Sequence, residues 1–168
     1  MAMSRLMMEN FLGSDNKART MRHNVMSALL KSDPTMLVNE INVLFSALPR
    51  ERFNMDERNK KFYRSKILIL FFIPGLDPLA EKSGNLGEAD FVVNYQERSW
   101  IIEVIIWPDE KGDKNLAFAA MKKIKKKNDA GFYRDIVRLA LVIEDEKRSV
   151  TWLERDGGEK KYPDDKNG

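Results

Sequence analysis

The chain of 168 residues is 43% hydrophobic and 33% charged, and its 29 Lys and Arg against 26 Asp and Glu leave a formal net charge of +3. At about 150 residues per domain this length predicts one folded domain, and the composition excludes an intrinsically disordered chain. The absence of Cys excludes a disulfide framework, a thiolate zinc site and a Cys nucleophile, and the single His23 excludes a cluster of His metal ligands. Any catalysis must therefore use carboxylates, lysines or hydroxyls.

The sequence lacks the features of a membrane protein. The longest uninterrupted apolar run, residues 67–73, has seven residues, whereas a membrane-spanning helix needs about 20. The stretch 1–12 carries Arg5 and Glu9 among its apolar residues and lacks a signal-peptide cleavage site. We therefore expect no membrane partner and a cytoplasmic location.

Three helices are predicted in the first 75 residues. Apolar residues recur at helical spacing from 25 to 48, and the interruption at Ser32-Asp33-Pro34 predicts two short helices in a hairpin, the second stopped by Pro49. A third helix is predicted from about 56 to 73, ending at Pro74-Gly75. Its last two turns are apolar on all sides, which predicts deep burial.

From residue 76 onward, short apolar runs separated by turns predict strands. Residues 91–95 and 100–107 flank the polar loop 96–99 and should form adjacent antiparallel strands. Further strands are predicted near 79–82, at 137–143 and at 150–153, with a fourth helix at about 115–129. This order predicts an α/β (α+β) chain in which helices bracket a mixed sheet.

Two acidic residues stand in otherwise apolar predicted strands. Asp90 begins the first strand of the hairpin, and Glu103 lies in the middle of the second, on the same face as Ile101 and Ile105. An ionised carboxylate on a buried face costs several kcal/mol unless it is paired or bound to a cation. Two carboxylates on adjacent strands suit one divalent ion with oxygen ligands. A salt bridge from Glu103 to a lysine of a neighbouring helix, or a half-exposed position, is the alternative.

The two acidic strands resemble the signature of a nuclease superfamily. The string GEADFVV at 87–93, followed by WIIEVI at 100–105, is similar to the PD-(D/E)xK pattern, in which an Asp at a strand start precedes a Glu-x-Lys in the next strand. More narrowly, residues 25–153 resemble the nuclease-like domain at the C-terminus of certain AAA-ATPase-like bacterial proteins. The resemblance implies a restriction-endonuclease-like mixed sheet flanked by helices. It divides the chain into an N-terminal helical extension (1–50), a nuclease-like core (51–155) and a flexible polar tail (156–168).

The resemblance also implies a Mg²⁺ or Mn²⁺ site. In that superfamily the Asp and the Glu bind the metal, which activates a water and stabilises charge on the phosphate, so Asp90 and Glu103 become the expected metal ligands and catalytic residues. The lysine of the pattern falls on Ile105, which cannot donate to a water or a phosphate. Lys60 in the third predicted helix and Lys123 in the fourth are the candidates for a relocated catalytic lysine. The resemblance thus implies hydrolysis that is impaired, or that depends on a lysine from a helix.

A stripe of lysines follows the second acidic strand. Between residues 111 and 127 there are seven Lys and one Asp, a local charge of +6. Such a stripe favours contact with a phosphate backbone, and a solvated helix face is the alternative. The expected nucleic-acid contacts are Lys122, Lys125, Lys126 and Lys127.

These patterns predict a nuclease-like domain directed to nucleic acid, with DNA as the expected partner and with metal-dependent phosphodiester hydrolysis impaired at Ile105. The alternative is a pseudoenzyme: a non-catalytic interaction or dimerisation module of nuclease fold in a larger ATPase-linked system. Its partner would be a second copy of the chain or an ATPase.

Overall fold

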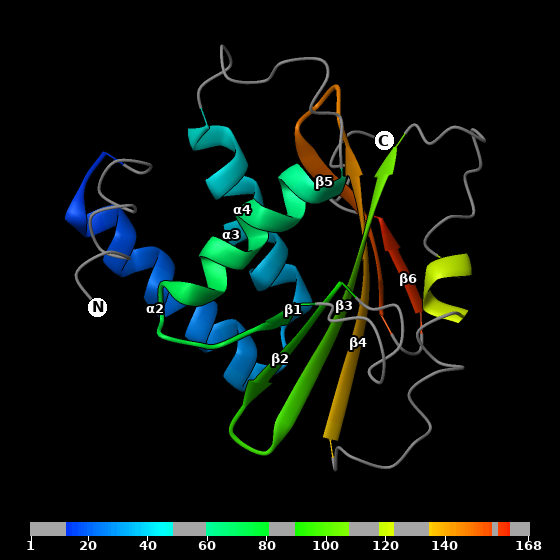
Figure 1. Ribbon diagram of the computed structural model, residues 1–168, viewed down its shortest axis with the longest axis horizontal. Helices are drawn as coiled ribbons and strands as arrows, with labels where there is room; N and C mark the ends of the chain where they lie inside the picture. Colours follow the sequence, from blue (N-terminus) through cyan, green and yellow to red (C-terminus); the bar gives the residue numbers. More distant parts are fainter. Residues whose placement is uncertain are drawn as a thin grey trace. The chain divides into compact units, whose positions relative to one another are not determined.

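In the part of the chain that the structure describes, the fold is α+β, with three long helices ahead of a six-stranded sheet (Figure 1). The computed structural model describes residues 13–48, 60–80, 90–107, 118–122, 135–155 and 158–161. The chain divides into two compact units, Met1–Asp77 and Pro78–Gly168. No helix of the described segments is long and apolar enough to cross a membrane.

The first two helices, α2 (Asp15–Lys31) and α3 (Pro34–Ala47), form the predicted hairpin. Ser14 caps α2 by accepting a hydrogen bond from the Lys17 N–H at 3.3 Å, and Ser32 ends that helix in the left-handed conformation, with φ of 52°. Asp33 then accepts from the Met36 N–H at 3.1 Å, and Pro34 occupies the first turn of α3. At the interruption seen in the sequence, α2 therefore ends at Ser32 and α3 begins directly afterwards at Pro34.

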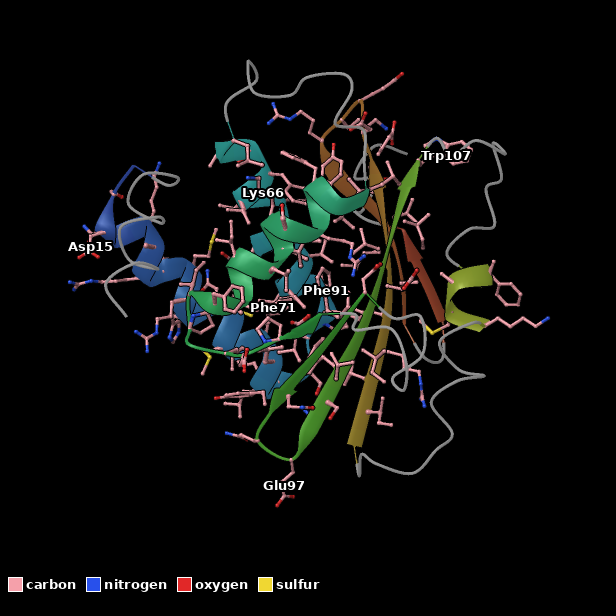
Figure 2. All side chains as sticks on the ribbon, in the orientation of Figure 1. Asp15, Lys66, Phe71, Phe91, Glu97 and Trp107 are labelled. Atoms are coloured by element: carbon pink, nitrogen blue, oxygen red, sulfur yellow. The ribbon has the colours of Figure 1, made fainter. Side chains whose placement is uncertain are left out.

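The third helix, α4 (Lys60–Phe72), belongs to the same compact unit as α2 and α3. The rings of Phe45 in α3 and Tyr63 in α4 meet edge to face, with their centroids 5.3 Å apart. This contact joins α4 to α3 within the unit Met1–Asp77. The expectation that the end of α4 is buried all round is wrong at Phe72, which is 46% exposed, although the labelled Phe71 beside it is fully buried (Figure 2).

A buried polar pair joins α2 to α3. Glu40 of α3 is 8% exposed and its Oε1 accepts a hydrogen bond from the Asn24 amide of α2 at 2.8 Å. Desolvation raises the pKa of Glu40 from its ordinary value of 4.5, and the hydrogen bond from Asn24 offsets part of that rise. The folded chain therefore holds the Glu40 proton more tightly than the unfolded chain does.

Glu40→Gln is expected to remove the decrease in folding stability that wild type shows as the pH rises. Because the folded pKa of Glu40 is raised, wild type is expected to lose stability as the pH rises from about 4.5 through that folded pKa. Gln keeps the acceptor for Asn24 and does not ionise, so the variant should match wild type near pH 4 and exceed its stability at pH 7. Urea unfolding at a series of pH values measures the difference. A difference that does not change with pH would mean that Glu40 ionises equally in both states.

The second unit contains a sheet with strand order β1-β2-β3-β4-β5-β6. All neighbouring strands are antiparallel except β3 and β4, which run parallel and side by side (Figure 1). A parallel pair needs a crossover, here residues 108–134, of which 118–122 are described and helical. The strands are β1 (Leu79–Ala80), β2 (Phe91–Tyr95), β3 (Arg98–Trp107), β4 (Asp135–Glu144), β5 (Ser149–Arg155) and β6 (Gly158–Lys161).

The sheet confirms the predicted strands and corrects two connections. The turn between β2 and β3 is only Gln96-Glu97, with Gln96 at φ of 54°, so Arg98 and Ser99 belong to β3 and not to a loop over 96–99. Ser99 is buried there and its hydroxyl donates to Asn94 Oδ1 at 2.6 Å. Residues 158–161 form β6 by pairing with β5, although the polar composition predicted a flexible tail over 156–168.

Candidate functional site

Strand β3 separates the side chains of the sheet into two contrasting faces. Alternation puts Trp100, Ile102 and Val104 on one side, where each is fully buried. Glu103 lies on the opposite side with Ile101 and Ile105, as the sequence pattern predicted. The register adds Val92 from β2 and Ala140 from β4 to this side. We call this side the Glu103 face.

The Glu103 face carries two apolar clusters. One, the hairpin-end cluster, consists of Val92, Ile101 and Ile136. The other, the helix-side cluster, consists of Ala120, Met121, Ala140 and Val142, with Ile105 and Trp107 packed against them. Figure 2 shows the two ends of β3, with Glu97 at the hairpin turn and Trp107 at the far end. Along β3, Glu103 lies between Ile101 of one cluster and Ile105 of the other.

Asp90 and Glu103 come together at this level of the sheet. Phe91 pairs with Ile102 in the antiparallel ladder, and continuing that register by one residue sets Asp90 opposite Glu103. Residues directly opposite each other in an antiparallel pair share a face. Both carboxylates are buried, since Asp90 is 1% exposed and Glu103 is 5% exposed. The structure thus brings the two predicted metal ligands together.

Asp90 also completes the end of the β2–β3 ladder. Its Oδ2 accepts a hydrogen bond from the Val104 N–H at 2.6 Å, at the point where β2 no longer offers a backbone partner. A short hydrogen bond to a carboxylate is among the stronger ones in proteins. Asp90 is therefore fixed against β3 beside Glu103, and its burial has a structural role whether or not a metal binds.

Residue 105, where the nuclease pattern has a lysine, is an isoleucine with apolar neighbours. Ile105 is half-buried and packs against the helix-side cluster, which includes Met121 and Val142. No charge faces a phosphate or a water from this position. Ile105, which replaces the lysine of the pattern, is therefore part of a packed apolar cluster.

The two relocated lysines expected from the sequence, Lys60 and Lys123, stay predictions. Lys60 begins α4 in the first compact unit, whereas Asp90 and Glu103 lie in the second. Lys123, Lys125, Lys126 and Lys127 lie outside the described residues. Lys122 is described and is exposed at the end of the helical segment 118–122, as a contact to nucleic acid requires.

The sequence analysis overlooked one cation. Arg138 lies in β4, within the run VRLALVI, and the register pairs it with Ile101, so it lies on the Glu103 face. The signal was available, because an Arg inside an apolar strand is as unusual as the Glu103 carboxylate in β3. The site on this face therefore contains a cation as well as two acids.

Comparison with family models, with curated proteins and with solved structures finds no match to this chain. The resemblance to the PD-(D/E)xK superfamily therefore rests on the residues themselves, namely Asp90, Glu103 and the order of the strands that carry them. The structure shows the α+β class and a mixed sheet, which is the coarse part of the expected fold.

The donor set fits a hard divalent cation. The described residues contain no cluster of three or more His, Cys, Asp or Glu side chains able to hold a metal. Asp90 and Glu103 supply two carboxylates, and Mg²⁺ is commonly bound through one or two carboxylates, with waters and substrate phosphates completing its coordination. The pair is compatible with Mg²⁺ or Mn²⁺ and lacks the soft ligands that structural zinc sites prefer.

Proposed function

We propose that this protein is a nuclease-like domain that binds nucleic acid, holds Mg²⁺ or Mn²⁺ at Asp90 and Glu103, and hydrolyses phosphodiesters only weakly. The observation that carries the proposal is the placement of two buried carboxylates opposite each other on β2 and β3. Two neighbouring carboxylates repel each other and are poorly solvated when buried, and a divalent cation offsets both costs.

The chemistry that suits this arrangement is the addition of water across a phosphodiester bond. A bound divalent metal lowers the pKa of its water and neutralises charge on the phosphate oxygens. The hydrogen bond from the Val104 N–H to Asp90 Oδ2 fixes the Asp90 carboxylate against β3 and would thereby orient it toward a metal. Glu103 would supply the second oxygen from the rigid centre of the sheet, where β2 and β4 flank β3.

Weak hydrolysis follows from position 105. A cation beside the metal normally stabilises negative charge as it develops on the phosphate, and loss of one such group lowers rates by about 100- to 1,000-fold. Ile105 offers no charge and is packed in the helix-side cluster. We therefore propose that this position limits the rate of hydrolysis, and that metal and nucleic-acid binding are retained.

Glu103→Gln tests the metal site. Titration calorimetry with Mn²⁺ is expected to detect binding to wild type, and the variant should bind at least about tenfold more weakly because it removes one of two anionic ligands. Glu144→Gln is a matched control, because Glu144 is a half-buried Glu on the same face at the far end of β4. Mn²⁺-dependent cleavage of plasmid DNA by wild type should be slow and should disappear in Glu103→Gln.

Two results would contradict the proposal. One is the absence of Mn²⁺ binding to wild type at millimolar metal, and the other is an unchanged affinity in Glu103→Gln. Either would favour the non-catalytic alternative, in which the fold serves as an interaction or dimerisation module. That alternative also has an observation in its favour, since Leu30, Val43 and Phe72 of the helical unit are large apolar side chains between 46% and 54% exposed.

A further inference from the structure

Arg138 lies on the Glu103 face, on the strand next to Glu103. In the parallel pair of β3 and β4, Glu103 is opposite Ala140 and Arg138 is two residues earlier, opposite Ile101. Strands about 4.8 Å apart and two residues of rise, about 6.6 Å, place the Glu103 and Arg138 backbones about 8 Å apart. The Arg side chain is long enough to cover much of that separation.

The register sets Arg138 one same-face position from Glu103, level with Ile101. Its neighbour on the same face toward the start of β4 is Ile136, in the hairpin-end cluster, and its neighbour toward the end is Ala140, in the helix-side cluster. Asp90 and Glu103 lie between the same two clusters on β2 and β3. Asp90 and Glu103 thus lie opposite each other, and Arg138 lies diagonally from Glu103 on the neighbouring strand β4. Arg138 is half-buried, so its guanidinium is partly shielded from water.

We infer that Arg138 binds the phosphate of the phosphodiester at this site and so contributes to substrate affinity, while position 105 stays uncharged. This inference rests on the proposed function and names the residue that contacts its substrate. A guanidinium stays protonated and presents a planar fork of N–H donors that matches two phosphate oxygens. The sheet fixes the backbone of Arg138, so only its side chain has to be ordered on binding.

The same chemistry explains why hydrolysis remains weak with Arg138 present. A guanidinium is a hydrogen-bond donor only and does not accept a proton, so it holds a phosphate without activating a water. Arg138 would thus preserve binding of the diester and leave the activation of water to the metal site. This division predicts that Arg138 affects phosphodiester affinity separately from metal affinity.

The alternative role for Arg138 is that of a countercharge to the buried acids. Removing a countercharge would change how Asp90 and Glu103 bind a metal, because the local charge then becomes more negative. Removing a phosphate ligand would change the affinity for the diester and leave the metal affinity nearly unaltered. The two roles are therefore separated by measuring both affinities on the same variants.

The test compares Arg138→Met with Arg138→Lys. Binding of a short fluorescent DNA duplex is measured by anisotropy in Mn²⁺ and in EDTA, and Mn²⁺ affinity is measured by calorimetry. Arg138→Met is expected to bind duplex in Mn²⁺ about 10- to 100-fold more weakly, as for a lost hydrogen bond to a charged group, with Mn²⁺ affinity retained. Arg138→Lys should recover part of the loss. Arg98→Met is the matched control, because Arg98 is also half-buried in β3 but lies on the opposite face.

Each outcome decides one question. If wild type binds Mn²⁺ and Arg138→Met binds duplex as tightly as wild type, the assignment of Arg138 is overturned and the metal site stands. The assignment is also overturned if Arg138→Met changes Mn²⁺ affinity as strongly as duplex affinity. If wild type binds no Mn²⁺, the proposed function fails, and duplex binding in EDTA then tests the role of Arg138. Weaker duplex binding by Arg138→Met alone supports a phosphate contact. Unchanged duplex binding by Arg138→Met overturns that contact.

Discussion

Ile105→Lys is expected to raise Mg²⁺-dependent cleavage of DNA by about 100-fold over wild type, since a positioned proton donor or cation contributes at least that much. The register explains the expected gain. Residue 105 lies two positions beyond Glu103 on the same face of β3, so a lysine there would extend along the side of the sheet that carries the proposed metal site. Cleavage is measured by the conversion of supercoiled plasmid to nicked and linear forms.

The cost of Ile105→Lys is expected to be moderate. Ile105 is half-buried beside Met121 and Val142, so a lysine stem can replace most of its apolar contacts while the ammonium extends toward solvent. A destabilisation of about 1–2 kcal/mol lies within the usual range for a substitution that disturbs packing without burying a charge. Urea unfolding of the variant gives this value independently of cleavage.

Three variants separate the restored lysine from other effects. Ile105→Met keeps the size without the charge and should leave cleavage at the wild-type rate. Ile106→Lys puts the same charge on the opposite face of β3 from a neighbouring half-buried position, and should also give no gain. The double variant Ile105→Lys with Glu103→Gln should lose the gain, because the lysine acts through the metal site. If wild type, Ile105→Lys and these three variants all cleave DNA at the same rate, the activity comes from a contaminating nuclease.

Asp90 is expected to show two separable roles when Asp90→Ala is compared with Asp90→Asn. Ala leaves the buried Val104 N–H without its 2.6 Å acceptor, and a lost hydrogen bond to a charged group costs about 1.5–3 kcal/mol of folding free energy. Asn retains an oxygen for that N–H, so it should cost less than Ala. Both variants remove the carboxylate charge, and both should weaken Mn²⁺ binding by about tenfold or more.

Urea unfolding and Mn²⁺ calorimetry on the same two proteins give the comparison. A large stability loss in both variants would mean that the charge of Asp90, and not its hydrogen bond, stabilises the end of the β2–β3 ladder. Wild-type Mn²⁺ affinity in Asp90→Asn would restrict Asp90 to the structural role and leave Glu103 without its proposed partner.

Local signals in the sequence were sufficient to place the elements. Ser32, Asp33 and Pro34 gave the helix boundary because capping depends on neighbouring residues in the chain. The alternation in WIIEVIIW gave the two faces of β3, since side chains in a strand alternate by geometry alone. The acidic pair was found for the same reason, as each carboxylate interrupts an apolar pattern.

Where the sequence analysis failed, the missing information was pairing between distant segments. Residues 158–161 are polar and became β6 only because the β5 backbone lies beside them, and backbone hydrogen bonds need no hydrophobic signal. The packing of α4 with the earlier helices likewise depends on contacts such as the one between Phe45 and Tyr63. Neither can be read from a local window of sequence.

The candidate site shows the same division. The sequence by itself determined that Asp90 and Glu103 are acids in apolar strands and that residue 105 is not a lysine. Only the tertiary structure decided that Arg138 shares their face, because a parallel register between β3 and β4 is set across the crossover 108–134 and not by the residues of either strand. A charge becomes part of a site through the strand it pairs with, and that pairing is a property of the folded sheet.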